Sequence, residues 1–305
     1  MKLGFLTVCL GNIPLKDKAK WASEQGFETL EVACWPRVND RDYAASDIDV
    51  VSLTVEKADE IKAYMKEYGI EISSLAYYDN NLDVNLEHRA CVNMHLKRCI
   101  DAAALLGVPS VGTFVGRNSE KSIKDNFDEF ESVFGELVRY AESKGIQIVI
   151  ENCPMVGWQQ PGVPGTISFT PELWEEMFKR VPNENFGLNF DPSHLYFQLI
   201  DYLPLLEKFK TKIFHVHAKD AEIFPERLGY VGIFDSQFEP HGKGYWRYRM
   251  PGLGKIDWKE FMAVLKSTGY DFVVSIEHED HLYEGSEEKV KEGLSLGLQH
   301  LQEAL

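Results

Sequence analysis

A short pattern recurs along this sequence: an amphipathic segment ends at a glycine, and an apolar segment follows at once. It reads SEQGFETLEV, KEYGIEISSL, ALLGVPSVGT, ESKGIQIVIE and KSTGYDFVVS. Glycine accepts the left-handed backbone conformation in which many helices end, and the apolar, β-rich run that follows favours a strand. Each repeat therefore predicts a helix, a stop and a strand. The glycines concerned are Gly26, Gly69, Gly107, Gly145 and Gly269.

The repeats extend to a complete set of eight strands. The opening segment KLGFLTVC supplies one strand, and FGLNFD and KIFHVH supply two more. Between strands, apolar residues recur at steps of three and four, as in residues 123–141, which is the period of a helix packed on one face. Right-handed crossovers return the chain to a parallel sheet, which can close. We predict an α/β fold, a (β/α)8 TIM barrel spanning residues 1–305 as a single domain. An open doubly wound sheet is the alternative.

One connection is much longer than the others. Residues 221–255 separate the seventh strand from its helix, and about 35 residues far exceed the usual length of such a loop. The segment is expected to be irregular and to act as a lid over the carboxyl end of the barrel or as an interface arm. Its aromatic residues, Tyr245, Trp246 and Tyr248, favour the interface and hence a homo-oligomer.

Composition excludes several classes of partner. Lysine and arginine number 32 against 48 acidic residues, a net charge of −16, which disfavours nucleic acid and membrane surfaces as partners. The five cysteines are scattered and form no CxxC motif, so we expect reduced, mostly buried thiols. The apolar start lacks a cleavage site typical of a secretory signal, and no stretch has the roughly 20 apolar residues of a membrane span. A cytoplasmic location is expected.

Polar residues stand in phase at the ends of the last four strands. Side chains alternate between the two faces of a strand, and each of these strands has one bulky apolar face and one more polar face. If the apolar faces pack on the helices, the polar faces point into the barrel. The residues that then converge at its carboxyl end are Glu151, Asp191, His217 and Glu277.

Three carboxylates gathered in one place repel each other unless a cation or a proton joins them. With an imidazole they form an oxygen-rich ligand set, which favours Mn²⁺, with Mg²⁺, Co²⁺ and Zn²⁺ as alternatives. The competing interpretation is an internal network in which Lys219 and the histidines neutralise the acids. The position of active sites at the carboxyl face of TIM barrels favours the metal.

Four segments together carry a resemblance to a known family. IENCPM, NFDPSHL, HVHAKD and SIEHED follow in this order. The chain resembles the xylose isomerase-like TIM barrels, and within them the sugar phosphate isomerase/epimerase group, which includes ketose 3-epimerases and inosose-processing enzymes. The resemblance covers nearly the whole chain and implies the same four metal ligands.

The resemblance also implies roles for single residues. Glu151 and Glu277 would act as catalytic proton acceptor and donor, and His194 would hold a substrate oxygen beside the metal; its alternative role is structural, at the start of a helix. Family members carry a substrate-binding arginine before a PG-x-G turn, where this chain offers Arg247 and Arg249 in a spacing that departs from that of the epimerases. A guanidinium group there would suit a carboxylate, a phosphate or vicinal hydroxyls.

Other aromatic and histidine residues give weaker indications. Trp35 and Trp158 follow strands and are candidates to bind a sugar ring, with core packing as the alternative for Trp35. His215 is expected one layer deeper in the barrel than His217. His88 and His95 are expected on a solvated helix face.

The sequence therefore predicts a divalent-metal-dependent isomerase or epimerase that acts on a small keto-sugar or related polyol by proton transfer next to a carbonyl, through an enediolate. One alternative is a lyase of the same fold, resembling an inosose dehydratase or an enzyme that cleaves C-glycosides. An AP endonuclease is disfavoured by the acidic charge and by the absence of matching histidines on earlier strands. A non-catalytic sugar-binding barrel is the last alternative.

Overall fold

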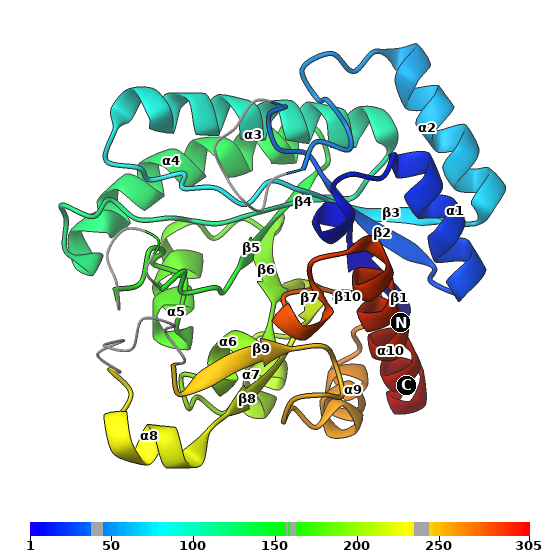
Figure 1. The fold of residues 1–305 in the computed structure, drawn as a ribbon. Coiled ribbons are helices and arrows are strands. Elements are labelled where there is room, and N and C mark those ends of the chain that lie inside the picture. The colour runs from blue at the N-terminus through cyan, green and yellow to red at the C-terminus, as the bar shows by residue number, and fades with distance from the viewer. Residues whose placement is uncertain (38–44, 157, 159–162, 235–243) are drawn as a thin grey trace.

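Eight parallel strands close into a barrel (Figure 1). The computed structural model describes residues 1–37, 45–156, 158, 163–234 and 244–305. Around the barrel the strands follow the order β1, β10, β7, β6, β5, β4, β3, β2. The predicted (β/α)8 barrel is confirmed, and the open sheet is wrong. The strands are β1 (Lys2–Leu6), β2 (Thr29–Ala33), β3 (Glu71–Ala76), β4 (Ser110–Thr113), β5 (Gln147–Glu151), β6 (Phe186–Phe190), β7 (Ile213–Ala218) and β10 (Val273–Ile276).

Helices alternate with the strands and surround the barrel. All five glycines of the repeated pattern have positive φ, between 68° and 93°, as the pattern predicts for helix ends. Short 3₁₀ helices, η1 (Thr7–Leu10) and η2 (His281–Tyr283), follow two of the strands. The helices around the barrel are α1 (Leu15–Gln25), α2 (Val55–Tyr68), α3 (Leu86–Leu106), α4 (Ile123–Ser143), α5 (Pro171–Arg180), α6 (Pro192–Tyr196), α7 (Leu203–Lys208), α9 (Trp258–Ser267) and α10 (Glu287–Ala304).

The apolar core lies between the strands and these helices. Phe186 of β6 is an example: its ring centroid lies 6.0 Å from that of Phe130 and 5.8 Å from that of Phe134, both on α4, and 5.6 Å from that of Phe178 on α5. The apolar faces of the strands thus point outward, as the sequence predicts. The alternating polar residues are left to fill the barrel.

Strand register brings the polar residues to one level. Glu151 of β5 is paired with Asn189 of β6, and Ser275 of β10 with His217 of β7. Because side chains alternate, the next inward positions on β6 and β10 are Asp191 and Glu277, one step closer to the carboxyl end. The register of the barrel therefore places these groups at its mouth.

The long connection after β7 is not wholly irregular, and that expectation is wrong. It contains β8 (Asp220–Ile223), the short helix α8 (Pro225–Val231) and β9 (Trp246–Arg249). The strands β8 and β9 form an antiparallel ribbon, which lies beside α6 and α7 in Figure 1. The part at 235–243, including His241, lies outside the described residues.

The cysteines carry no disulfide: all five are free thiols, and three of them, Cys34, Cys99 and Cys153, are buried. This agrees with the prediction of reduced, mostly buried thiols. Within the described ranges, no helix combines the length and the apolar character that crossing a membrane requires.

Candidate metal centre

Three carboxylates and a histidine meet at the carboxyl end of the barrel. Glu151 ends β5, Asp191 follows β6 and Glu277 follows β10. One side-chain ligand atom from each, together with one from His194, lies within 4.8 Å of the others. Glu151, Asp191 and His194 are buried, whereas Glu277 keeps 12% of its side chain exposed. The group therefore lies at the mouth, partly open to a ligand.

His194 is placed by the turn after β6. Asp191 begins α6 and accepts a hydrogen bond from the backbone N–H of Ser193, which orients the first turn of the helix. Nε2 of His194 lies 3.2 Å from Glu151 Oε1 and 3.3 Å from Asp191 Oδ2. Ionised carboxylates only accept hydrogen bonds, so Nε2 carries a proton and Nδ1 can accept one from the Tyr248 hydroxyl at 3.1 Å.

His217 borders the same group and a second one. Its Nδ1 lies 3.1 Å from Glu151 Oε1 and 3.0 Å from Glu277 Oε2. Its Nε2 lies 2.7 Å from Glu31 Oε2, and with Glu31 and His215 it forms a second cluster of ligand-type groups. The structure thus joins His217 to the predicted ligands through direct contacts, and it adds His194 as an equally close imidazole.

Lys219 lies among the acids. Its ammonium nitrogen is 2.7 Å from Glu277 Oε2, 3.0 Å from Glu279 Oε2 and 3.4 Å from Asp191 Oδ2, and its side chain is 2% exposed. It also lies 4.5 Å from the centroid of the Tyr248 ring. The network of lysine and acids considered as the alternative to a metal is therefore present in the structure.

Burial and the neighbouring charges together shift the pKa values of these groups. Burial alone raises the pKa of Glu151, but Lys219 and the two histidines hold it well below its usual value. Burial keeps the pKa of Asp191 above its usual value in spite of His194 and Lys219. Although burial opposes a positive charge, Glu277, Glu279 and Asp191 raise the pKa of Lys219 well above its usual range.

Glu31 and Tyr78 extend the site across the barrel. Glu31 of β2 is fully buried, and its Oε1 accepts a 2.6 Å hydrogen bond from the Tyr78 hydroxyl. Glu31 and Glu277 face opposite nitrogens of His217. A carboxylate on the far nitrogen of a ligating histidine fixes the orientation of the ring and strengthens its donor atom. A β-carbon on Gly112 would lie 2.4 Å from the Tyr78 hydroxyl, so this arrangement requires glycine there.

The ribbon turns its aromatic and basic residues to opposite sides. Trp246 stacks on Phe197 at 3.8 Å between ring centroids, and Tyr248 contacts His194. Arg247 and Arg249, at the alternate positions, both pair with Glu222. Arg249 also donates from Nε to Asp280 Oδ2 at 2.8 Å. Both guanidinium groups are engaged with carboxylates, and substrate binding by either stays a prediction.

The two predicted tryptophans lie at the ends of one row of aromatic rings. The ring of Trp35 lies 6.1 Å from that of Tyr78, Tyr78 lies 5.1 Å from Phe114, and Phe114 lies 5.9 Å from Trp158. Trp35 is buried, and within the described part of the chain its indole nitrogen has no hydrogen-bond partner. Because Tyr78 also lies 5.8 Å from His217, the row follows one side of the acidic group.

Sequence reasoning missed three of these residues, Glu31, Tyr78 and Glu279, and it gave Tyr248 a role only at an interface. An ionisable residue inside the apolar strand TLEVA was a signal for Glu31. No signal was available for Tyr248, because the phase of a strand cannot be read in a segment expected to be irregular.

The expectation for the α3 histidines is half right. His88 is exposed, as predicted, but His95 is buried, and its Nε2 lies 2.7 Å from the carbonyl oxygen of Cys34. The Tyr77 ring covers it, with 4.5 Å between ring centroids. His95 on α3 therefore contacts the chain just after β2 through the carbonyl oxygen of Cys34.

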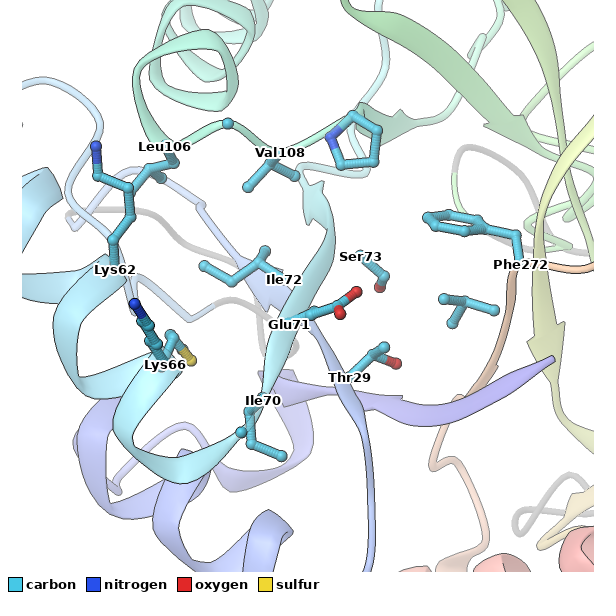
Figure 2. Close-up of a pocket in the computed structure, with 15 residues that line it drawn as sticks. Thr29, Lys62, Lys66, Ile70, Glu71, Ile72, Ser73, Leu106, Val108 and Phe272 are labelled. Carbon is cyan, nitrogen blue, oxygen red and sulfur yellow. The ribbon is translucent and has the colours of Figure 1, made fainter.

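A hollow of about 500 Å³ opens at the opposite end of the barrel. Figure 2 shows Glu71 and Ser73 on β3, with Lys62 and Lys66 on α2 and Phe272 across from them. These strand residues stand at the amino-terminal end of the barrel, the face that stabilises the fold in TIM-barrel enzymes rather than the face that carries chemistry. We therefore place the candidate site at the acidic mouth and not in this hollow.

The acidic group fits a divalent cation. Oδ2 of Asp191 is buried and, within the described residues, accepts no hydrogen bond, although it faces Lys219 and His194. A buried carboxylate oxygen in this state calls for a positive partner. Three carboxylates and an imidazole are a donor set that Mn²⁺ and related ions accept. Glu151, Asp191 and Glu277 would hold the ion together with His217, whose Nδ1 contacts two of them.

Comparison with known proteins agrees with this architecture. The inosose isomerase of Bacillus velezensis is 24% identical, over 91% of this chain and 88% of the relative. The structure of the IolI protein with a zinc atom matches with a TM-score of 0.68 and 22% identity, over 100% of this chain and 96% of that one. D-psicose 3-epimerase with D-tagatose, from Clostridium cellulolyticum, matches with a TM-score of 0.72 and 15% identity, over 100% and 99%.

A match to a protein-family profile identifies the family of this chain. The profile of the xylose isomerase-like TIM barrels matches residues 19–302, which is nearly the whole chain. The resemblance read from the four strand-end motifs agrees with this match, and the closed barrel agrees with the fold. The chain belongs to the xylose isomerase-like TIM barrel family.

Proposed function

We propose that this protein is a divalent-metal-dependent isomerase or epimerase that moves a proton next to the carbonyl of a small keto-sugar or related polyol. The observation that carries the proposal is the convergence of Glu151, Asp191 and Glu277 with two histidines at the barrel mouth. The relatives named for inosose and ketose isomerisation support the substrate class. A cytoplasmic location and a homo-oligomeric state remain predictions from the sequence.

Mn²⁺ is the proposed ion, because the donor set is rich in oxygen; the zinc in the IolI structure keeps Zn²⁺ among the alternatives. When bound, a divalent ion would polarise a substrate carbonyl and so make the neighbouring C–H bond easier to deprotonate. That C–H bond is only weakly acidic, so the site has to lower the barrier to removing its proton.

Glu151 and Glu277 are suited to move the proton. They come from β5 and β10, which are separated by β6 and β7, so their carboxylates reach the group from two sides. In the metal-free protein Lys219 and His217 lower the pKa of both carboxylates against burial, so both are ionised there. We propose that one carboxylate accepts the proton from carbon, while the other, after taking a proton from solvent, donates it to the opposite face of the same carbon; the first then releases its proton to solvent.

His194 is suited to hold a substrate oxygen. Its ring is edge-on to that of Tyr248, and its Nδ1 accepts a hydrogen bond from the Tyr248 hydroxyl. Its Nε2–H therefore points toward the carboxylates and the open mouth. The aromatic row from Trp35 to Trp158 offers an apolar wall for the sugar ring. Arg247 and Arg249 are the candidates to bind a polar group of the substrate, and each already pairs with Glu222.

The test is solvent deuterium exchange. The Mn²⁺-loaded protein is incubated in D₂O with a panel of ketoses, inososes and 3-keto sugars, and the products are followed by NMR and mass spectrometry. We expect deuterium next to the carbonyl with the carbon skeleton and its oxygens retained. Glu277→Gln should lower kcat by at least about 100-fold, since it removes an acid/base group.

The control is Glu172→Gln, the same change at an exposed residue on α5, which should retain exchange. Loss of water or of an aglycone would instead indicate a lyase. Absence of exchange with every substrate, or unchanged turnover by Glu277→Gln, would contradict the proposal.

A further inference from the structure

Lys219 has a position that the proposed reaction does not explain. Its ammonium group contacts Glu277, Glu279 and Asp191, and lies 3.9 Å from Glu151. Three of these four acids are proposed metal ligands. The lysine therefore occupies the place of the positive charge that the acidic group calls for.

An ammonium group and a divalent cation cannot share this place. Lys219 uses the same Oε2 of Glu277 and Oδ2 of Asp191 that face the centre of the group. Two positive charges bound to the same oxygens repel each other strongly in a buried site. Binding of an ion must therefore break the contacts of Lys219 with Glu277 and Asp191.

The structure also shows where the ammonium can remain. Glu279 lies 3.0 Å from Nζ, is not a member of the metal-type group, and keeps 29% of its side chain exposed. The face of the Tyr248 ring lies on another side at 4.5 Å, a distance at which an aromatic ring attracts a cation. Neither contact involves a proposed ligand.

We propose that Lys219 is an internal counter-ion that competes with a divalent cation for Glu277 and Asp191, and that Glu279 and the Tyr248 ring retain its ammonium group once the cation is bound. The inference rests on the proposed metal site. It implies that Lys219 lowers metal affinity but neutralises the metal-free state, in which the four acids would otherwise have only His194 and His217 as partners.

The first experiment measures Mn²⁺ affinity by isothermal titration calorimetry on the metal-stripped full chain. Lys219→Met removes the competing charge, and the variant should bind Mn²⁺ at least about tenfold more tightly than the wild type. Lys219→Gln provides a second neutral side chain if the methionine variant does not fold. The matched control is Lys212→Met, which removes a lysine before the same strand, where Nζ bonds to the carbonyls of Asn183 and Phe186; its affinity should stay within about twofold.

The second experiment tests whether Glu279 acts through Lys219. Glu279→Gln should weaken Mn²⁺ binding several-fold in the wild-type background, because the displaced ammonium loses its remaining carboxylate. In the Lys219→Met background the same change should have less than about a twofold effect, which is the coupling that a double-mutant cycle isolates. A purely electrostatic effect of Glu279 on the ion would persist in both backgrounds.

The outcomes separate this inference from the proposed function. If the wild type binds Mn²⁺ and the neutral variants bind it equally or more weakly, Lys219 does not compete and the inference is overturned while the metal site stands. An equal effect of Glu279→Gln in both backgrounds would overturn the role given to Glu279. If neither the wild type nor the variants bind an ion, the proposed function fails, and the inference with it.

Discussion

Two histidines on β7, two residues apart, lie in opposite electrostatic surroundings. His217 faces Glu31, Glu151 and Glu277, and these carboxylates raise its pKa well above the usual value although burial opposes the charge. His215 lies one layer deeper and contacts Asn189 Oδ1 and Ser73 Oγ, which are neutral. There burial lowers the pKa of His215 to about 4. In the metal-free protein His217 is therefore held charged and His215 neutral.

The buried neutral His215 predicts a pH dependence of stability. In the unfolded chain a histidine has a pKa of about 6.5. Between about pH 6.5 and 4 this residue is therefore protonated in the unfolded state but neutral in the folded state. The free energy of unfolding should fall through this window as pH falls, by up to about 3 kcal/mol from this group. His215→Gln should remove that part of the slope in urea titrations.

The control for this prediction is His88→Gln, which changes an exposed histidine on α3 and should leave the slope of the wild type. Identical slopes for His215→Gln and the wild type would show that His215 is protonated in the folded protein.

Glu31 predicts an effect on metal affinity without being a ligand. Its Oε2 lies 2.7 Å from His217 Nε2, and Tyr78 holds its other oxygen. Glu31→Gln leaves the size of the side chain but loses one of these two contacts, so Mn²⁺ affinity should fall by roughly 10- to 100-fold. Equilibrium dialysis measures the effect.

Glu28→Gln is the matched control for Glu31, because it makes the same change in charge just before β2, where Glu28 accepts from the Leu3 N–H. Its Mn²⁺ affinity should equal that of the wild type. If Glu31→Gln also binds normally, the histidine does not depend on Glu31.

At the scale of elements, one carboxylate joins the two ends of the ribbon segment. Oδ1 of Asp220 accepts hydrogen bonds from the backbone N–H groups of Ala221, Lys255 and Ile256. Its Oδ2 accepts from the Trp258 indole and from the N–H groups of two glycines. The same residue thus ties the start of β8 to the turn that follows β9. Through this turn Asp220 sets the position of Tyr248 over His194.

Asp220→Asn should release this turn. An amide has one acceptor oxygen, so about three of the donors would face an NH₂ group, and the free energy of unfolding should fall by roughly 3 kcal/mol. Denaturant titration measures the loss, and limited proteolysis should cut the segment between β8 and α9 faster. Asp257→Asn, which changes the N-cap of α9 to an equally good cap, should differ from the wild type by less than about 0.5 kcal/mol. Equal stability of the two variants would contradict the role of Asp220.

At the scale of the whole molecule, the barrel could be predicted because its signals are local and repeated. Each glycine and each apolar strand can be read without knowing the rest of the chain, and eight such units favour a closed barrel over an open sheet. The convergence of Glu151, Asp191 and Glu277 could be predicted as well, because the phase of a strand and a common carboxyl edge place them without side-chain detail.

The remaining parts of the site depend on contacts across the barrel. Glu31 reaches His217 only because closure brings β2 opposite β7, and the sequence separation of the two residues gives no sign of it. His95 was wrongly expected at the surface, because its burial comes from Tyr77 and Cys34 on other elements. The position of Tyr248 depends on β9, which pairs with β8 outside the barrel sheet. Long-range pairing, rather than local propensity, decides these positions.

The most direct test of the central claim is anomalous diffraction from crystals of the full chain grown with Mn²⁺. The account predicts one anomalous peak per chain at the barrel mouth, within coordinating distance of the carboxylates of Glu151, Asp191 and Glu277 and of a histidine nitrogen. Crystals that show no peak there at millimolar Mn²⁺, with Lys219 still bonded to Glu277, would contradict it.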